Sequence, residues 1–368
     1  MDIKNIVTQF RFEGEFRNVE EFGSGHINST YIADFGEKRY VIQKINTNVF
    51  KNPDALMDNV FSVTRYLKNI IIENGGEPER ETLKFIRTNE GKEYLKTPDG
   101  ECYRAYIFVD NSICYDSADT PEMFKKSGAA FGQFQKLLSA FPADTLFETI
   151  PHFHDTFYRF ENEFLVSLEN ADESRKENAK AEIDFIISRK GEMKRITDLL
   201  ENNRIPVRVT HNDTKLNNVL FDKNTGDCLA VIDLDTVMPG SALYDFGDSI
   251  RFGASTAAED EKDLSKVEMS LDYFKAYAEG YLSEAGDTLN SCEKDNLAFS
   301  AKLITLECGM RFLTDYLNGN VYFKVDYPEH NLIRAKNQLK LVSDMENKMS
   351  KMEEIVNSIQ SPALDTYD

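Results

Sequence analysis

The sequence predicts an α+β protein with two lobes: a small antiparallel β-sheet lobe with one packed helix, and a larger lobe that is mainly α-helical. Three observations support this prediction. Short strand-like runs occupy residues 29–109, helical apolar periodicity dominates after residue 120, and a short β-like island lies between residues 206 and 233. We therefore place an N-terminal lobe at residues 1–109 and a C-terminal lobe at residues 110–368.

In the first lobe, turn signals such as Pro98-Asp99-Gly100 separate runs of strand-forming residues. These runs predict strands at residues 29–35, 39–45, 83–88, 93–97 and 102–109. Apolar residues spaced by three and four predict one amphipathic helix at residues 54–74, which should pack on the sheet.

The second lobe has mostly helical periodicity. Helices are predicted at residues 121–141, 155–167, 174–202, 272–283, 293–317 and 331–359. The island that interrupts them predicts strands at residues 206–210, 219–222 and 228–233. Its loops hold most of the unusual polar residues of the chain, so function is sought there.

The composition excludes several classes of partner. The 368 residues include 43 Lys and Arg against 63 Asp and Glu, a formal net charge of −20. This charge disfavours binding to nucleic acid or to an anionic membrane, and no apolar run approaches the roughly 18 residues of a membrane span. With no secretory signal pattern and five scattered cysteines, the chain is expected to be cytoplasmic with reduced thiols. The sequence does not predict its oligomeric state.

The densest polar motif is His211-Asn-Asp213-Thr-Lys-Leu-Asn-Asn218, which has the spacing H-x-D-x-x-x-x-N. Phosphoryl transfer needs a carboxylate to receive the proton of the acceptor hydroxyl, oxygen ligands for magnesium and fixed positive charge. Asp213 and Asn218 would supply the first two, with His211 as a hydrogen-bonded strut. Taken alone, the spacing is equally compatible with a polar capped loop.

An apolar strand that ends in two acids follows this loop. Asp233 and Asp235 differ by two positions, so they share a face in an extended strand. Magnesium prefers oxygen ligands and takes one or two protein carboxylates together with substrate phosphate. Asn218, Asp233 and ATP would complete such a set, whereas a helix cap or a surface turn is the structural alternative.

Two glycines lie near the start of the strand-rich lobe, in Phe22-Gly23-Ser24-Gly25. Glycines let backbone N–H groups approach phosphates closely. Gly23, Ser24 and Gly25 are therefore candidates for covering a nucleotide. A glycine hairpin that only reverses the chain is the alternative.

These three motifs, in this order, resemble those of the aminoglycoside phosphotransferase and choline kinase superfamily, whose members have the bilobal protein-kinase fold. The likeness covers nearly the whole chain. Longer runs resemble the N-acetylhexosamine 1-kinases of that superfamily, among them residues 25–28, 152–156, 208–218, 232–236, 245–255 and 307–312. The resemblance implies an enzyme of amino-sugar salvage that uses ATP and Mg²⁺ to phosphorylate the anomeric hydroxyl of GlcNAc or GalNAc.

The resemblance also implies a role for each matching residue. Asp213 matches the catalytic base, and Asn218 and Asp233 match the magnesium ligands. The phosphate-covering loop is matched by Gly23, Ser24 and Gly25, and main-chain groups from Phe108 to Asn111 would pair with adenine. The sugar contacts are matched by His26, Arg311 and Tyr322, together with Asp213.

The sequence departs from the protein-kinase pattern on its third strand. Gln43 stands in register with the usual phosphate-gripping lysine, and strand alternation points Lys44 to the opposite face. The sheet-facing stripe of the predicted helix, residues 59–63, contains no acid. The Lys–Glu ion pair is therefore expected to be absent, so magnesium, backbone amides and Lys215 would neutralise the nucleotide beside Gln43.

Several residues have structural alternatives. Arg311 lies in an apolar helix and could pair with Glu307 rather than with a substrate, and Tyr322 could be a packing aromatic. Asp245 and Asp248 are expected to cap a helix and to support the H-x-D loop.

Two other functions remain open. A kinase for a cationic acceptor such as choline, homoserine or an aminoglycoside would suit the acidic charge, although Arg311 is a poor neighbour for a cation. An inactive nucleotide-binding regulator would explain the missing ion pair. The retention of Asp213, Asn218 and Asp233 together argues against the second alternative.

Overall fold

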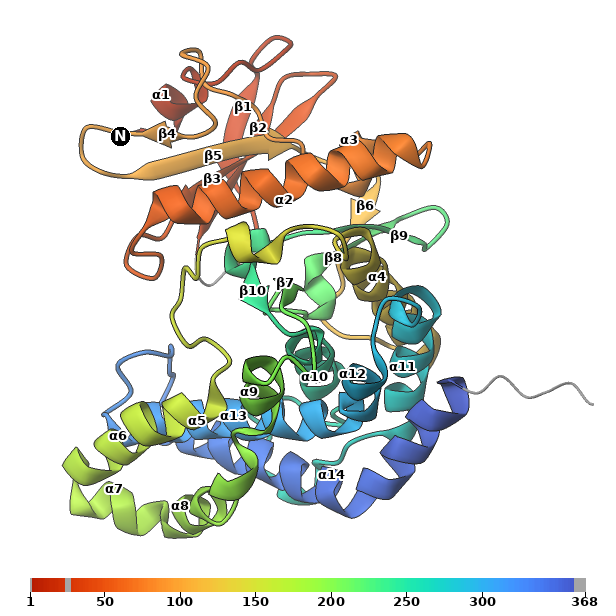
Figure 1. The fold of residues 1–368 in the computed structure, drawn as a ribbon. Coiled ribbons are helices and arrows are strands. Elements are labelled where there is room, and N and C mark those ends of the chain that lie inside the picture. The colour runs from red at the N-terminus through yellow and green to blue at the C-terminus, as the bar shows by residue number, and fades with distance from the viewer. Residues whose placement is uncertain (1, 24–27, 361–368) are drawn as a thin grey trace, which may run out of the picture. The chain divides into compact units, whose positions relative to one another are not determined.

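The computed structural model describes residues 2–23 and 28–360, and the chain divides into two compact units (Figure 1). The first unit comprises Met1–Cys114, Ala140–Ile150 and Asn218–Pro239, and the second comprises Tyr115–Ser139, Pro151–Asn217 and Gly240–Asp368. Segments that are remote in the sequence therefore fold together. The predicted fold class is confirmed, because an antiparallel sheet with a packed helix accompanies a mainly helical region.

The first unit is built on a five-stranded antiparallel sheet with the order β1-β2-β3-β5-β4. Its strands are β1 (Asn18–Glu21), β2 (Ser29–Asp34), β3 (Arg39–Ile45), β4 (Leu95–Lys96) and β5 (Cys102–Ile107). Alternate side chains face opposite sides of the sheet. Ile42 and Tyr103 pack on the side of helix α1 (Ile3–Val7), whereas Ile45 and Cys102 pack with residues of helix α2 (Pro53–Glu73).

Helix α2 begins at the signals that the sequence contains. The Asn52 side chain accepts a hydrogen bond from the Ala55 N–H at 3.2 Å, and Pro53 occupies the first turn. Its buried stripe includes Leu56 and Val60. This stripe fixes which face of α2 turns toward the sheet.

A smaller three-stranded sheet carries the polar motifs of this unit. Its strands are β6 (Ser112–Ile113), β8 (Val219–Asp222) and β9 (Cys228–Val231), in the order β6-β8-β9. In the antiparallel pair β8–β9, Val219 lies opposite Val231. Residues just before β8 and just after β9 therefore lie at the same end of the hairpin. The unit also contains α3 (Pro78–Glu81) and the short 3₁₀ helices Ala143–Thr145 and Leu234–Thr236.

The second unit is mainly helical. Its helices are α4 (Pro121–Leu137), α5 (Thr156–Arg159), α6 (Leu165–Asn170), α7 (Glu173–Asn178), α8 (Lys180–Ile187), α9 (Arg195–Glu201), α10 (Ala242–Gly253), α11 (Leu271–Ala285), α12 (Ser291–Asp295), α13 (Leu297–Leu317) and α14 (His330–Gln360). Strand β7 (Arg208–Thr210) leads into the H-x-D loop. The chain passes between the units near the 3₁₀ turn Leu216–Asn218 and at β10 (Met238–Gly240).

Helices α4 and α11 approach closely because glycines face their contact. A Cβ on Gly128 would lie 2.4 Å from the Tyr277 carbonyl oxygen, and a Cβ on Gly280 would lie 2.0 Å from the Lys125 carbonyl oxygen. Larger residues at either position would force the helices apart. The close pair places α4 against the H-x-D loop, where its aromatic side chains contact His211.

Some element predictions were wrong. Residues 83–88 form no strand, because Phe85 makes only a single bridge with Tyr106. The predicted helix 174–202 is broken into α7, α8, a 3₁₀ turn containing Gly191, and α9, and glycine is a poor helix former. The predicted helix 155–167 is interrupted by a π-helical turn at Phe160–Phe164.

The predicted helix 293–317 is divided at Asn296 into the end of α12 and the whole of α13. The other predicted strands and helices agree with the structure to within a few residues at their ends. The edge strand β1 was missed because three of its four residues are exposed, so it has no apolar alternation. Over the part of the chain that the structure describes, no helix combines the length and apolar character needed to cross a membrane.

Candidate active site

Helix α10 holds the H-x-D loop in place. The Asp245 carboxylate accepts hydrogen bonds from the backbone N–H groups of His211 (2.9 Å) and Asn212 (2.8 Å). The Asp248 carboxylate accepts one from the Thr214 N–H (3.0 Å). Two carboxylates of one helix therefore fix the backbone on both sides of Asp213, as the sequence predicted for their supporting role.

The environments of these two carboxylates differ. Burial raises the pKa of Asp245 despite its hydrogen bonds. Burial alone would also raise the pKa of Asp248, but the charges of Arg251 and Lys215 lower it overall. Neither acid caps the helix, which corrects that part of the prediction, because the N-cap of α10 is Ser241.

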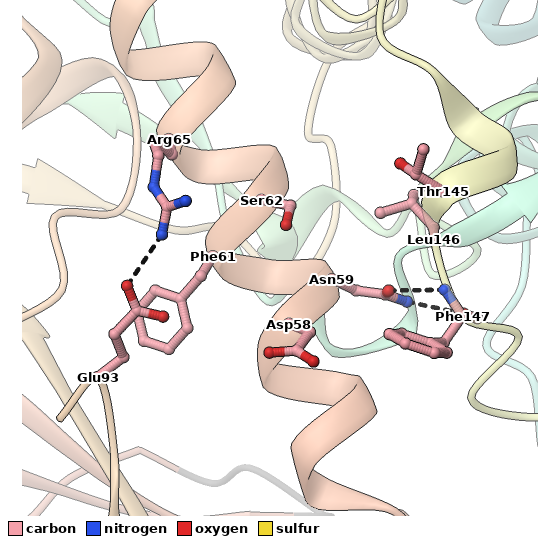
Figure 2. Close-up of a pocket in the computed structure, with 9 residues that line it drawn as sticks. All are labelled: Asp58, Asn59, Phe61, Ser62, Arg65, Glu93, Thr145, Leu146 and Phe147. Carbon is pink, nitrogen blue, oxygen red and sulfur yellow. Dashed lines mark hydrogen bonds and ion pairs between the residues drawn. The ribbon is translucent and has the colours of Figure 1, made fainter.

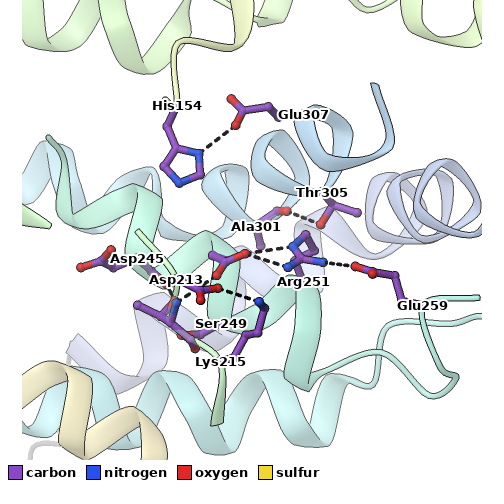
Figure 3. A network of polar contacts seen from close by, with 12 residues as sticks. His154, Asp213, Lys215, Asp245, Ser249, Arg251, Glu259, Ala301, Thr305 and Glu307 are labelled. Carbon is purple, nitrogen blue, oxygen red and sulfur yellow. Dashed lines mark hydrogen bonds and ion pairs between the residues drawn. The ribbon is translucent and has the colours of Figure 1, made fainter. Parts of the chain in front are cut away.

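Asp213 lies within this supported loop and forms an ion pair with Lys215, at 2.8 Å between Oδ1 and Nζ (Figure 3). The two side chains are 30% and 35% exposed, respectively. Burial alone would lower the pKa of Lys215, but the charge and hydrogen bond of Asp213 raise it overall. The predicted base is thus a reachable carboxylate beside a lysine that stays charged at neutral pH.

His211 is fully buried and serves the loop as a strut. Its ring lies edge-on to Phe131 and Phe134, with centroid distances of 5.6 and 5.9 Å. Its Nδ1 accepts a hydrogen bond from the Asp213 N–H at 3.3 Å. A ring enclosed in this way supports the loop rather than exchanging protons with a substrate.

A second polar cluster joins His154 to α13. Glu307 is buried and accepts hydrogen bonds from His154 Nδ1 (2.8 Å) and Thr156 Oγ1 (2.7 Å), and Figure 3 shows the imidazole facing this carboxylate. Burial would raise the pKa of Glu307, but His154, Arg159 and Arg311 lower it overall. The carboxylate is therefore ionised at neutral pH, and His154 is the donor in their hydrogen bond.

Arg311 lies one turn further along α13 and does not pair with Glu307. Its guanidinium carbon is 5.4 Å from the ring centroid of Phe153 and 5.8 Å from that of Phe323. Within residues 2–23 and 28–360, the structure gives it no carboxylate partner. The half-buried guanidinium thus rests on ring faces.

Tyr322 is 64% exposed in the segment that follows α13. The buried carboxylate of Asp315 accepts hydrogen bonds from the backbone N–H groups of Val321 (2.9 Å), Tyr322 (2.8 Å) and Phe323 (2.9 Å). One carboxylate therefore fixes three consecutive residues. Tyr322 is not an ordinary packing aromatic, because most of its side chain is accessible.

In the first unit, Asn218 and Asp233 meet at one end of the β8–β9 hairpin. The Ile232 N–H donates a hydrogen bond to the Asn218 carbonyl oxygen at 2.9 Å. Asp233 is exposed and has a φ of 58°, in the left-handed region that non-glycine residues rarely adopt.

The side-chain oxygens of this pair suit magnesium, which prefers hard ligands. Across the described residues there is no group of three or more His, Cys, Asp and Glu side chains that could hold a metal. Magnesium commonly takes one or two protein ligands and completes its shell with water and phosphate oxygens, and Asn218 and Asp233 would suit that mode of binding.

On β3, the side chains of Gln43 and Lys44 have different partners, as strand alternation predicts. Lys44 forms an ion pair with Glu101. Gln43 Oε1 instead accepts hydrogen bonds from Arg104 on the neighbouring strand, at 3.0 and 2.8 Å. Gln43 therefore holds a cation that the sequence analysis did not identify.

Helix α2 is anchored through an amide. Asn59 Nδ2 donates hydrogen bonds to the carbonyl oxygens of Phe147 (2.7 Å) and Val237 (2.9 Å), and its Oδ1 accepts one from the Phe147 N–H (2.8 Å). Figure 2 shows the two hydrogen bonds between Asn59 and Phe147. Both residues line a cavity of about 280 Å³. Asn59 thus ties α2 to the segment that follows Asp233-Leu-Asp235, the D-L-D motif.

Some main-chain groups of the predicted adenine hinge form hydrogen bonds within the protein. The Phe108 N–H donates to the Arg39 carbonyl oxygen at 3.0 Å, and the Asn111 carbonyl oxygen accepts from the Lys223 N–H at 2.8 Å. The ring of Phe108 lies edge-on to that of Phe22, at 6.0 Å. Adenine binding at Phe108 and Asn111 stays a prediction.

Only part of the predicted glycine loop belongs to the described structure. Gly23 has a φ of 78°, and a Cβ built there would meet no atom of the described residues within 4 Å. Ser24, Gly25 and the predicted sugar contact His26 lie outside the described residues.

Several supporting residues were missed by the sequence analysis, namely Arg104, Asn59, Asp315 and the His154–Glu307 pair. The available signal was a charged or amide side chain inside an otherwise apolar, periodic segment. Such a residue is costly to bury unless it finds a partner. The sequence does not reveal which partner it finds.

Solved structures of small-molecule kinases share this architecture. An aminoglycoside phosphotransferase from Alicyclobacillus acidocaldarius has a TM-score of 0.60 at 12% identity, with 94% of each chain covered. A spectinomycin phosphotransferase in complex with ADP and spectinomycin has a TM-score of 0.55 at 15% identity, covering 95% of this chain and 97% of that one. Choline kinase from Cryptosporidium parvum has a TM-score of 0.54 at 17% identity, covering 95% of this chain and 94% of that one. The fold is therefore kinase-like.

The sequence itself matches a family. Residues 18–282 match the model of the phosphotransferase enzyme family, which is more than half of the chain. The chain belongs to this family. It is therefore a member of a family of phosphotransferase enzymes.

Proposed function

We propose that this phosphotransferase is a cytoplasmic N-acetylhexosamine 1-kinase of amino-sugar salvage. It transfers the γ-phosphoryl group of ATP to the anomeric hydroxyl of GlcNAc or GalNAc and yields the sugar 1-phosphate and ADP. The anomeric oxygen forms a bond to the γ-phosphorus, and the bond from that phosphorus to the β,γ-bridging oxygen breaks. The hydroxyl proton passes to the Asp213 carboxylate.

The support for Asp213 as the base comes from how it is held. In a loose phosphoryl-transfer transition state the alcohol proton is transferred late, so positioning contributes more than basicity. Asp245 and Asp248 fix the backbone on either side of Asp213. Lys215 remains charged beside it and offsets negative charge near the transferred group.

The single observation that favours a sugar over a cationic acceptor is the environment of Arg311. Its guanidinium lies on two ring faces, and no carboxylate within the described chain forms an ion pair with it. It can donate hydrogen bonds to the hydroxyl or acetamide oxygens of a neutral sugar, whereas it would repel a quaternary or protonated amine. Together with the sequence resemblance, this supports an N-acetylhexosamine as the acceptor.

Asn218 and Asp233 are the residues that would hold Mg²⁺. When bound, the cation neutralises charge on the triphosphate. The chain contributes a carboxylate and an amide oxygen at one end of a hairpin, a donor set that magnesium accepts.

A panel of acceptors tests this proposal. GlcNAc, GalNAc, choline, homoserine and kanamycin are each incubated with ATP and Mg²⁺, ADP release is measured, and the product is examined by phosphorus NMR. We expect turnover with the amino sugars and a phosphorus signal coupled to the anomeric proton. Turnover with choline, homoserine or kanamycin alone would assign a cationic acceptor. ADP binding without turnover on any acceptor would assign a regulator.

A further inference from the structure

An arginine occupies the face of the first unit's sheet that turns toward α2. Arg104 on β5 is only 2% exposed and lies directly opposite Gln43 on β3. Cross-strand partners project from the same face of a sheet. A cation therefore lies on the face that carries the phosphate-gripping lysine in protein kinases, but one strand further along the sheet.

The contacts of Arg104 leave its guanidinium little freedom. Its Nε and Nη2 donate to Gln43 Oε1 at 3.0 and 2.8 Å, while Gln43 Nε2 donates to Thr30 Oγ1 at 3.2 Å. Its Nη1 forms an ion pair with Asp235. Two neighbouring strands thus orient the guanidinium toward the second acid of the D-L-D motif.

Asp235 is the point at which several segments meet. Besides Arg104, its carboxylate accepts a hydrogen bond from Asn28 Nδ2 at 2.6 Å, and Asn28 Oδ1 accepts one from the Asn46 N–H at 2.9 Å. Burial alone would lower the pKa of Arg104, but Asp235 raises it overall, and Asp233 adds to this effect. Arg104 is therefore a permanent cation within the field of both acids.

The turn after β9 is clamped on two sides. Arg104 and Asn28 hold Asp235, and Asn59 of α2 holds the Val237 carbonyl oxygen at 2.9 Å. Asp233, two residues before Asp235, is exposed and has a left-handed backbone. Such a conformation persists only when its surroundings over-determine it, and the contacts of Asp235 supply that constraint.

We propose that Arg104 is the positioning cation of the nucleotide site: through Asp235 it fixes the turn that presents Asp233, in place of the strand lysine and helix glutamate of protein kinases. This inference rests on the proposed function, in which Asp233 is a magnesium ligand. Stability alone is a weak reason for a buried ion pair, because its replacement by neutral residues is often tolerated. The Arg104–Asp235 pair would instead be needed to hold the turn in the position that presents Asp233, which neutral residues would not do.

The test measures ADP binding to the full chain by calorimetry, once with Mg²⁺ and once with EDTA. In R104Q we expect the affinity measured with Mg²⁺ to fall by about tenfold or more, as is typical when a residue that supports a metal ligand is removed. The affinity measured with EDTA should change little. No loss, or an equal loss in both conditions, would overturn the inference.

Two further variants keep the test decisive. R104Q leaves Asp235 buried and charged, so R104Q/D235N is measured as well; it removes both charges and should show the same metal-dependent loss. R189M/E346Q is the matched control, since Arg189 and Glu346 form a two-point ion pair in the second unit at 2.8 and 2.6 Å. The control should bind ADP like the wild type in both conditions.

D233N separates this inference from the proposed function. If D233N loses the metal-dependent affinity while R104Q and R104Q/D235N keep it, the inference fails and the proposed metal site stands. If D233N also keeps it, both fail. If all three lose it, Arg104 and Asp235 act on the same metal-dependent step as Asp233, as proposed.

Discussion

Individual charged residues in this chain differ in what neutralises them. Glu307 accepts hydrogen bonds from His154 and Thr156, and Arg104 forms an ion pair with Asp235. Arg311 instead rests on the rings of Phe153 and Phe323. A half-buried cation without a carboxylate is costly unless a ligand completes its hydrogen bonds. This contrast is why we propose Arg311 as a contact of the acceptor.

Replacing Arg311 by methionine should raise the KM for GlcNAc and leave the KM for ATP nearly unchanged. The lost hydrogen bonds to a charged donor are worth about 1.5–3 kcal/mol, or about tenfold to a hundredfold in KM. Steady-state kinetics with each substrate varied in turn would measure this. R334M is the matched control, because the Arg334 guanidinium also lies over a ring, that of Phe312 at 5.6 Å. An unchanged KM for GlcNAc in R311M would remove Arg311 from the acceptor site.

We expect the contribution of Glu307 to stability to depend on pH. Its pKa in the folded chain is below the ordinary value of 4.5, so folding favours the ionised form. Its contribution to the free energy of unfolding is fully present above pH 4.5 and is lost as pH falls through the folded pKa. The stability gap between wild type and E307Q, measured by urea unfolding, should therefore narrow below that pH. A gap that stays constant would contradict the assignment.

Among single residues, the proposed base and metal ligands could be predicted from the sequence, whereas their supports could not. The H-x-D-x-x-x-x-N spacing and the acid that ends the following strand make Asp213, Asn218 and Asp233 visible as candidates in one sequence. Arg104 and Gln43 are 61 positions apart. Their contact depends on strand register, which the sequence pattern does not specify.

Elements form as predicted where local pattern and tertiary contacts agree. Strands β3 and β8 have the predicted ends, because a short run of strand-forming residues in each is bounded by turn signals. Strand β1 exists only through its pairing with β2 and has no apolar pattern of its own. The segment at residues 83–88 has the pattern, but only Phe85 and Thr88 form single bridges.

Asp315 of helix α13 holds the segment that follows the helix. Its carboxylate accepts hydrogen bonds from three consecutive N–H groups, at residues 321–323. An amide in its place has one acceptor oxygen and no charge. In D315N we expect faster hydrogen exchange at these three amides and a higher KM for GlcNAc, with the KM for ATP unchanged. D326N is the control, because the Asp326 side chain is 75% exposed. Unaltered exchange at Tyr322 would contradict the role given to Asp315.

Over the whole molecule, the order of the chain and the order in space differ. Residues 218–239 belong to the first unit although they come from the later part of the sequence. They join it through pairing of β8 with β6. A boundary drawn along the chain does not represent such interleaving, because the periodicity of a segment does not show which unit it packs with.

The net charge of −20 bears on how the activity should depend on salt concentration. An acidic protein attracts cations at long range, and salt screens that attraction. With a neutral sugar as acceptor and ATP kept saturating, kcat/KM for the sugar should change less than about twofold when KCl is raised from about 50 to about 300 mM. A decline of severalfold would indicate a cationic acceptor.

The proposed reaction depends most on Asp213, which is expected to receive the proton of the anomeric hydroxyl during phosphoryl transfer. The most direct measurement compares D213N with wild type, using GlcNAc-dependent ADP release for turnover and calorimetry for Mg²⁺–ADP affinity. Loss of a general base should lower kcat by about a hundredfold to ten-thousandfold, while the affinity for Mg²⁺–ADP stays near the wild-type value. Wild-type turnover in D213N would contradict the account.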